Sequence, residues 1–156
     1  MSADERPLTT WDGLPVADEP PYGAMAVVFR RVRDGIEVLL LHRSENGPDY
    51  EGDWAWTPPS GARLPAEAVD ACVRRELREE AGLGPPLEVV PNSPESWRVY
   101  VAEVGGNVRV RLHDLEHDRF IWADPEHALR VCLPDVVKEG LCLAIRHIRV
   151  GPVRSG

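Results

Sequence analysis

The sequence predicts an α/β protein in which a mixed sheet lies between helices. Strand-like segments occur on both sides of one long early helix, a second long helix closes the chain, and turn signals join neighbouring strands. With 156 residues, 43% of them apolar, the chain is long enough to bury one core. We therefore expect a single domain over 21–150, an extended N-terminal arm over 1–20 and a tail over 151–156.

The first half of the domain predicts two strands and a helix. YGAMAVVFRRV and IEVLLLHR flank RDG, whose Asp-Gly pair is a strong hairpin signal. A loop rich in Gly, Pro and acidic residues follows over 44–60. The next segment predicts a helix over about 66–81. Gly82 suits the position just after a helix, and the prolines that follow cannot continue it.

The second half predicts another hairpin, a short strand and two helices. WRVYVAEV and VRVRL alternate apolar and polar residues around GGN, and RFIWA is a further strand. Asp124 and Pro125 are typical of the N-cap and first position of a short helix. Pro134 opens the last helix, whose apolar stripe predicts a core face made by Val136, Val137, Gly140, Leu141, Ala144, Ile145 and Ile148.

Charge and composition restrict the possible partners. A net charge of −8 disfavours nonspecific binding to nucleic acid or to an anionic membrane. No apolar run approaches the roughly 20 residues that span a bilayer, and the first residues lack an apolar signal core. The three cysteines lie far apart among apolar residues, as reduced core cysteines do. We expect a cytoplasmic protein with a small-molecule partner, in which the arm and apolar stripes would permit a homodimer.

The helix over 66–81 carries carboxylates where a core face is expected. At 100° per residue, Glu76 lies about 20° from Val69, and Glu80 about 20° from Val73. Glu79 falls beside Cys72 by the same arithmetic. Such a charge run is usually a solvated face, but here the outer arc already has its own charged residues.

A divalent metal ion explains this inward arc better than solvent does. Three neighbouring carboxylates repel one another, and burying one unpaired charge costs several kcal/mol. Hard dications such as Mg²⁺, or Mn²⁺, bind carboxylate oxygens and relieve both penalties. The geometry therefore predicts a metal site at the C-terminal end of the helix.

Residues 61–83 also resemble a known family. Their pattern is G-x5-E-x7-R-E-U-x-E-E-x-G-U, where U is aliphatic, and this pattern is the Nudix box. The chain fills it without a gap, at Gly61, Glu67, Arg75, Glu76, Leu77, Glu79, Glu80, Gly82 and Leu83. The resemblance, which extends over about 21–150, implies a Nudix-type α/β/α sandwich and hydrolysis of a phosphoanhydride in a nucleoside diphosphate linked to another group.

The resemblance also implies roles for individual residues. Glu76, Glu79 and Glu80 would bind Mg²⁺ or Mn²⁺, and the backbone carbonyl of Ser60 would complete the shell. Arg75 would orient a carboxylate, while Gly61, Glu67 and Gly82 would shape the box. For the general base the alternatives are a box glutamate, Glu116 in LEHDRFIW and, next in order, Glu103. We favour Glu116 as a ligand or base.

The segment WTPPSG and the later EH followed by Trp resemble diadenosine tetraphosphate hydrolases. Ser60 departs from the lysine common there, and the tyrosines that clamp a base are not identifiable. We expect His42, Arg43 and Arg63 to contact phosphate, with Trp56, or else Trp54 or Tyr50, against a base. The loop histidines His113 and His117 are further phosphate candidates.

Two other functions stay open. One is a (d)NTP pyrophosphohydrolase that releases pyrophosphate, or a pyrophosphohydrolase that acts on a nucleotide sugar. The other, from a different class, is a non-catalytic nucleotide sensor on the same scaffold, because a fold does not fix a function. A sensor could lose box carboxylates, whereas this chain keeps all of them. Hydrolysis is therefore the favoured interpretation.

Overall fold

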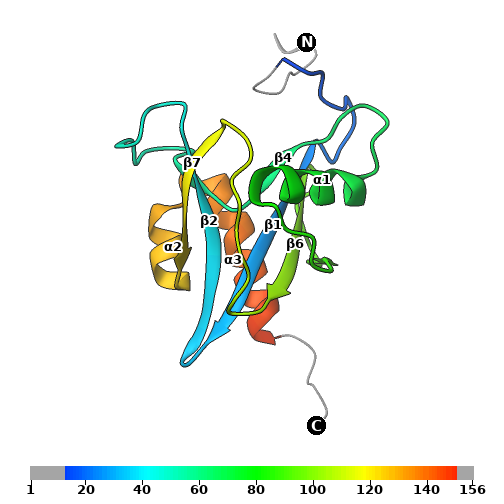
Figure 1. The fold of residues 1–156 in the computed structure, drawn as a ribbon. Helices are drawn as coiled ribbons and strands as arrows, with labels where there is room; N and C mark the ends of the chain where they lie inside the picture. The colour runs from blue at the N-terminus through cyan, green and yellow to red at the C-terminus, as the bar shows by residue number, and fades with distance from the viewer. Residues whose placement is uncertain (1–12, 151–156) are drawn as a thin grey trace.

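The computed structural model describes residues 13–150 (Figure 1). Its elements are, in chain order, β1 (Gly23–Val32), β2 (Gly35–Arg43), β3 (Trp56–Thr57), β4 (Ser60–Ala62), α1 (Val69–Ala81), β5 (Glu88–Val89), β6 (Trp97–Val104), β7 (His117–Ala123), α2 (Pro125–Val131) and α3 (Asp135–Val150). Within these residues, none of the helices has the length and apolarity that a membrane span requires.

The strands form one mixed sheet, as predicted. Its central order is β3-β2-β1-β6-β5, with β4 also pairing β1 and β7 pairing β2. The first two strands form the expected antiparallel hairpin. The β1–β6 pair is parallel over eight residue pairs, and α1 lies in the long connection that a parallel pair needs.

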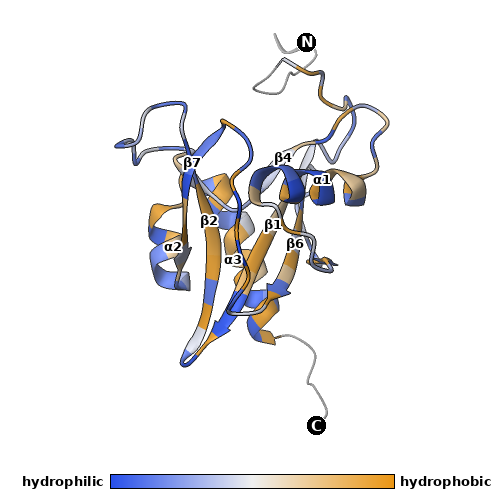
Figure 2. Cartoon of the chain, viewed as in Figure 1, coloured by the Kyte–Doolittle hydropathy of each residue, from blue (hydrophilic) through white to orange (hydrophobic). Residues whose placement is uncertain are grey.

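Helices cover both faces of the sheet, which confirms the predicted sandwich (Figures 1 and 2). Side chains of β1 alternate between two buried clusters. Met25, Val27 and Phe29 join the cluster that contains the core face of α3. Ala24, Ala26 and Val28 join the cluster that contains the apolar side of α1. This period of two residues is what a strand buried on both sides produces.

The predicted second hairpin is wrong. Residues 108–112 form no strand, and β6 pairs with β1 and β5 instead. The alternating side chains of this segment, Val108, Val110 and Leu112, pack against the α1 cluster. The Arg111 N–H donates to the Ala81 carbonyl at 2.9 Å. The alternation of apolar residues over 108–112 therefore results from packing against the α1 cluster and not from strand pairing.

The boundaries of the two long helices need smaller corrections. α1 begins at Val69, three residues after the predicted start, because Ala66 has a positive φ of 64° and Ala68 is extended. Its predicted end is confirmed: Gly82 is left-handed, with φ 68°. In α3, Val136 was expected in the core but is 55% exposed.

The predicted N-terminal arm lies partly outside the described residues. Within the described part, Val16 and Ala17 are buried, and the Ala17 N–H donates to the Arg63 carbonyl at 2.7 Å, whereas 13–15 and 18–20 are exposed. The predicted tail, 151–156, also lies outside the described residues.

Candidate active site

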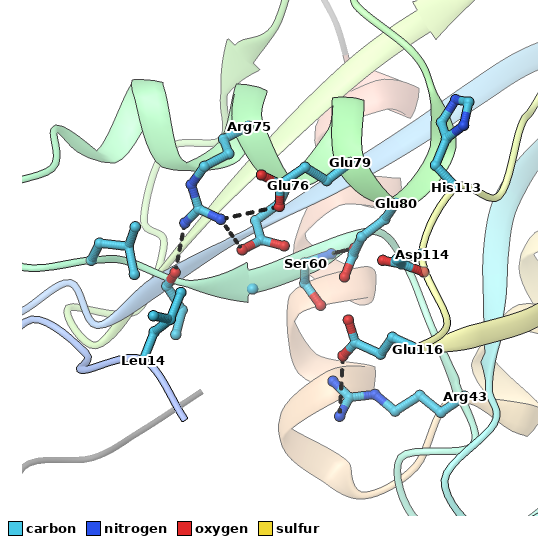
Figure 3. Close-up of a pocket in the computed structure, with 13 residues that line it drawn as sticks. Leu14, Arg43, Ser60, Arg75, Glu76, Glu79, Glu80, His113, Asp114 and Glu116 are labelled. Atoms are coloured by element: carbon cyan, nitrogen blue, oxygen red, sulfur yellow. Dashed lines mark hydrogen bonds and ion pairs between the residues drawn. The ribbon is translucent and has the colours of Figure 1, made fainter. Parts of the chain in front are cut away.

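A pocket of about 490 Å³ opens beside the C-terminal half of α1 (Figure 3). It collects side chains from α1, from β4 and from the segment that precedes β7. The charged and polar residues lining it are Arg43, Ser60, Arg75, Glu76, Glu79, Glu80, His113, Asp114 and Glu116. The structure thus brings the three box glutamates and Glu116 together, although Glu116 lies 36 positions beyond Glu80 in the chain.

Glu80 is the most deeply buried of these carboxylates, with 2% of its surface exposed. The Ser60 N–H donates to its Oε1 at 2.9 Å, which ties the last turn of α1 to β4. Burial, followed by the nearby charges of Glu76 and Glu116, raises the pKa of Glu80 well above its usual value. The charged form therefore needs a cation at this position.

Glu76 lies in a similar environment one turn earlier. Burial raises the pKa of Glu76 to about 7, although the Arg75 charge and a 2.8 Å hydrogen bond from Arg75 Nη1 act in the opposite direction. Its carboxylate occupies the space where a Cβ of residue 61 would stand. Gly61 therefore leaves room for Glu76, in addition to shaping the turn.

Arg75 and Glu67 brace the start of the helix. The guanidinium donates to both Glu67 oxygens, at 2.8 and 3.0 Å, and to the Ala62 carbonyl at 3.1 Å. Glu67 also accepts the Leu64 N–H at 3.0 Å. The hydrogen bonds from Arg75 lower the pKa of Glu67 despite partial burial, and Glu67 raises the pKa of Arg75. This bidentate pair fixes the loop before α1 against the helix that carries the three carboxylates.

Glu116 reaches the pocket from the opposite wall. Its backbone carbonyl accepts hydrogen bonds from the Ser44 N–H at 2.8 Å and the Ser44 hydroxyl at 3.0 Å. Its side chain is 14% exposed and forms an ion pair with Arg43 at 4.0 Å. The other acid considered, Glu103 on β6, pairs with Arg31 on β1 and does not line this pocket.

Asp114 and His117 complete a cluster that sequence reasoning missed. One ligand atom from each of four residues, Glu80, Asp114, Glu116 and His117, lies within 4.8 Å of the others. Asp114 went unrecognised because it lies in a bend over 114–116, where no regular periodicity shows which acids face the pocket. His117 was considered only for phosphate contact. Burial lowers the pKa of its imidazole.

The donor set fits a divalent cation. Asp114 Oδ1 is buried and has no hydrogen-bond partner, and Glu80 is a buried carboxylate whose pKa is raised by its neighbours. Buried polar atoms without partners are uncommon, and a bound ion is one explanation for them. The site therefore has both an excess of negative charge and a buried ligand oxygen, on Asp114, that has no hydrogen bond.

Three residues predicted to contact substrate do not line this pocket, and their side chains have structural contacts instead. The guanidinium of Arg63 donates to the carbonyls of Glu19, Pro21 and Glu67, so it anchors the N-terminal segment. His42 is fully buried, with its ring nitrogens 2.9 Å from Asp118 Oδ1 and 2.7 Å from the Tyr50 carbonyl. Trp56 is 5% exposed and belongs to the α3-side core.

Arg43 and Trp54, two candidates for substrate contact, lie beside each other at the edge of the site. Arg43 lines the carboxylate pocket, and its guanidinium carbon lies 5.9 Å from the centre of the Trp54 ring. Trp54 is 45% exposed and has a φ of 68°. Both residues also line a second cavity of about 160 Å³, which shares Ser60 and Gly61 with the first.

The walls of this second cavity are largely apolar. They are formed by Met25, Pro94, Trp97, Val99, Val136, Val137 and Gly140, with Thr57 and Ser96 supplying hydroxyl groups. The exposed Val136 therefore has a place in the cavity wall. The anionic pocket and the apolar cavity share Arg43, Ser60 and Gly61 as wall residues.

Comparison with known proteins agrees with this architecture. A family model described as the NUDIX domain matches residues 20–140. A search of the curated proteins finds no match.

Solved structures that resemble the chain carry several activities in their names. A C. elegans Ap4A hydrolase in a binary complex is 24% identical, with a TM-score of 0.66, over 83% of this chain and 98% of its own. The E. coli dihydroneopterin triphosphate pyrophosphohydrolase is 14% identical, with a TM-score of 0.62, over 84% and 99%. The NUDIX domain of Shewanella oneidensis NrtR, complexed with ADP ribose, is 19% identical, with a TM-score of 0.62, over 81% and 86%. At these identities the likenesses establish the fold alone.

Proposed function

Because the chain belongs to the NUDIX domain family, whose box it carries complete, we propose that its carboxylate pocket hydrolyses a phosphoanhydride bond in a nucleoside diphosphate linked to another group. The observation that carries the proposal is the convergence of Glu76, Glu79, Glu80 and Glu116 on one pocket. When bound there, Mg²⁺ or Mn²⁺ neutralises phosphate charge and favours ionisation of water.

The residues of the chain divide the remaining work. Glu76, Glu79, Glu80 and the Ser60 carbonyl hold the ion, while Arg75 orients the Glu76 carboxylate through its 2.8 Å hydrogen bond. Glu116 takes the proton of the attacking water, since it lies across the pocket from the box and its backbone is held by Ser44. Arg43, next to Glu116, contacts a phosphate oxygen of the substrate.

A dinucleoside polyphosphate such as diadenosine tetraphosphate is the substrate class that we favour. Such a molecule has a polyphosphate for the carboxylate pocket and an aromatic base for the adjoining apolar cavity. Trp54 replaces Trp56 as the stacking residue, because its ring is exposed at the rim and Arg43 lies beside it. The C. elegans Ap4A hydrolase, which shares the fold, gives additional support.

The alternatives are a (d)NTP or nucleotide-sugar pyrophosphohydrolase and a non-catalytic nucleotide sensor. The E. coli pyrophosphohydrolase and the NUDIX domain complexed with ADP ribose share this fold, so both alternatives are tested beside the favoured substrate. The intact carboxylate set favours catalysis over sensing, because a sensor does not need to activate water.

Product analysis distinguishes these functions. Diadenosine tetraphosphate, ATP, the dNTPs, ADP-ribose and a nucleotide sugar are incubated with the protein in Mg²⁺ or Mn²⁺, and in EDTA, and products are separated by ion exchange. ATP plus AMP from the dinucleotide, lost in EDTA, is the expected result. Pyrophosphate plus a monophosphate from an NTP would move the activity to the pyrophosphohydrolase group. An absence of products with either ion would contradict hydrolysis, and nucleotide binding would then test the sensor.

A further inference from the structure

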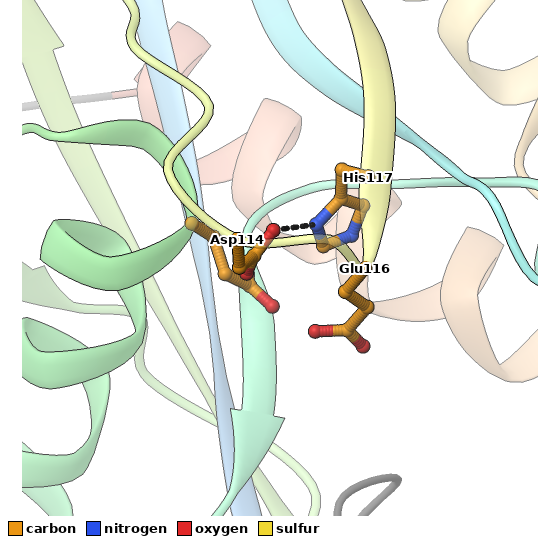
Figure 4. Close-up of side chains that lie close together, drawn as sticks. Asp114, Glu116 and His117 are labelled. Carbon is orange, nitrogen blue, oxygen red and sulfur yellow. Dashed lines mark ion pairs between the residues drawn. The ribbon is translucent and has the colours of Figure 1, made fainter.

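We propose that His117 supplies a nitrogen ligand, beside Asp114, Glu80 and Glu116, and that this mixed cluster binds a transition-metal ion such as Co²⁺ or Zn²⁺ selectively over Mg²⁺ (Figure 4). The inference rests on the proposed metal-dependent function and concerns residues outside the Nudix box, apart from Glu80. It adds a nitrogen ligand to the site, for which the glutamates of α1 alone predict only oxygen ligands.

The His117 side chain has the position that a metal ligand requires. It is 1% exposed, and its Nδ1 has no hydrogen-bond partner. Asp114 Oδ1 forms a long ion pair with it at 3.4 Å, and this oxygen is also buried without a hydrogen bond. A cation bound between the two atoms would satisfy both more closely than this long pair does.

The spacing of the cluster suits one ion. Bonds of about 2.1 Å place neighbouring ligand atoms of an octahedral shell about 3 Å apart, and opposite ones about 4.2 Å apart. The four candidate ligand atoms lie within 4.8 Å of one another. The ligand atoms therefore need to move closer together by about half an ångström to bind one ion, and side-chain rotation can bring this about.

The backbone holds these ligands from two sides. Ser44 fixes the segment before His117 through its N–H and hydroxyl bonds to the Glu116 carbonyl. His117 itself pairs with Arg43 at the start of β7, and the register shifts there, between His42 and Arg43. Such a bulge re-aims neighbouring side chains, and bulges are common next to active sites. Glu80 is fixed by the Ser60 N–H from the opposite wall.

The ligand chemistry sets the selectivity. Mg²⁺ strongly prefers oxygen ligands and water, whereas an imidazole nitrogen suits Co²⁺ and Zn²⁺. Removal of the nitrogen should therefore weaken binding of these ions much more than binding of Mg²⁺.

The test uses the full chain without nucleotide. Binding of Co²⁺, Zn²⁺ and Mg²⁺ is measured by calorimetry for the wild type, for His117→Asn and for His113→Asn. His113 is the matched control, since it lines the same pocket but lies outside the cluster. We expect His117→Asn to weaken Co²⁺ and Zn²⁺ binding about 10- to 100-fold and Mg²⁺ binding by less than about 3-fold. His113→Asn should leave the ratio of the affinities at the wild-type value.

A folded His117→Asn protein with the wild-type ratio of Co²⁺ to Mg²⁺ affinity would overturn the proposal. If that variant does not fold, the wild type with ¹⁵N-labelled histidine provides the second measurement: Zn²⁺ should shift a ring nitrogen of His117, and an unmoved resonance would refute the assignment. Neither measurement requires turnover. Absence of hydrolysis would therefore count against the proposed function alone, while hydrolysis with an unmoved His117 resonance would count against the histidine ligand alone.

Discussion

The Glu76 carboxylate lies directly over the Cα of Gly61, so that a Cβ at position 61 would overlap Cδ and both oxygens of Glu76. The position of the Glu76 carboxylate on α1 therefore depends on the glycine of β4, although 15 positions separate the two residues. Arg75 also donates a hydrogen bond to this carboxylate at 2.8 Å, which a displacement of Glu76 would break.

This contact predicts the effect of Gly61→Ala. The added methyl group should displace Glu76 and weaken Mg²⁺ or Mn²⁺ binding by about tenfold or more, as loss of a well-placed ligand or its support does. Calorimetric titration measures the affinity. Gly84→Ala is the matched control, because a Cβ at position 84 meets nothing within 4 Å. Wild-type metal affinity in Gly61→Ala would show that Glu76 is not a ligand.

Glu80→Gln should reduce turnover by a factor of about 100 or more while the fold survives. Glutamine keeps an oxygen for the Ser60 N–H and removes a charge that is unfavourably buried in the metal-free protein. Circular dichroism and thermal unfolding check the fold, and steady-state kinetics check the rate. Glu126→Gln, at an exposed position on α2, is the control. Wild-type activity in Glu80→Gln would refute the metal-site assignment.

Glu116→Gln tests the general base. Glutamine has a similar shape but cannot accept the proton, so kcat should fall about 100-fold with a smaller change in KM. Because Glu116 is also a candidate ligand, metal affinity is measured on the same protein. An unchanged rate would make Glu116 an ordinary loop acid.

Trp54→Ala tests the stacking residue. Stacking of a base on an aromatic ring contributes about 1–3 kcal/mol, so kcat/KM for a dinucleoside polyphosphate should fall roughly tenfold, mostly through KM. Hydrolysis of a small phosphoanhydride without a base should be unaffected by the change. Phe120→Ala, an exposed aromatic residue that lines neither cavity, is the control. Equal losses for both kinds of substrate would indicate a structural role for Trp54.

The raised carboxyl pKa values predict how pH affects the metal-free protein. Glu76 has a folded-state pKa of about 7 against an ordinary 4.5, and the pKa of Glu80 is also raised. The contribution of Glu76 to stability is present below pH 4.5 and is lost as pH rises through about 7, and Glu80 acts in the same direction. For Glu76 alone the loss is about 3 kcal/mol. Glu67, whose pKa is lowered, acts in the opposite direction and loses its contribution as pH falls below 4.5.

Bound metal should reverse the loss. Urea unfolding between pH 5 and pH 8 in EDTA should show a stability decrease with rising pH, and saturating Mg²⁺ should restore more stability at pH 8 than at pH 5. Glu76→Gln should flatten part of the EDTA profile. A Mg²⁺ effect that is equal at both pH values would contradict the assignment of Glu76 and Glu80 as ligands.

Local periodicity was enough to predict the strands of the first hairpin, the end of α1 at Gly82 and the inward face of Glu76 and Glu80. These features depend on neighbours within a few residues, and burial on a helix or strand follows from the spacing. The family resemblance gave the sandwich and the hydrolase assignment.

Only the tertiary structure decided which distant residues meet. Asp114 and His117 reach Glu80 because the chain before β7 crosses beneath the end of α1 and is held there by Ser44. Arg63 and His42 have polar side chains suited to phosphate, but their hydrogen bonds are to carbonyls and a carboxylate within the domain. Residues 108–112 alternate like a strand because Val108, Val110 and Leu112 pack against the α1 cluster while Arg109 and Arg111 are exposed. In each case the contacts of the side chain depend on long-range packing. A short stretch of sequence does not determine which distant residue a side chain will contact.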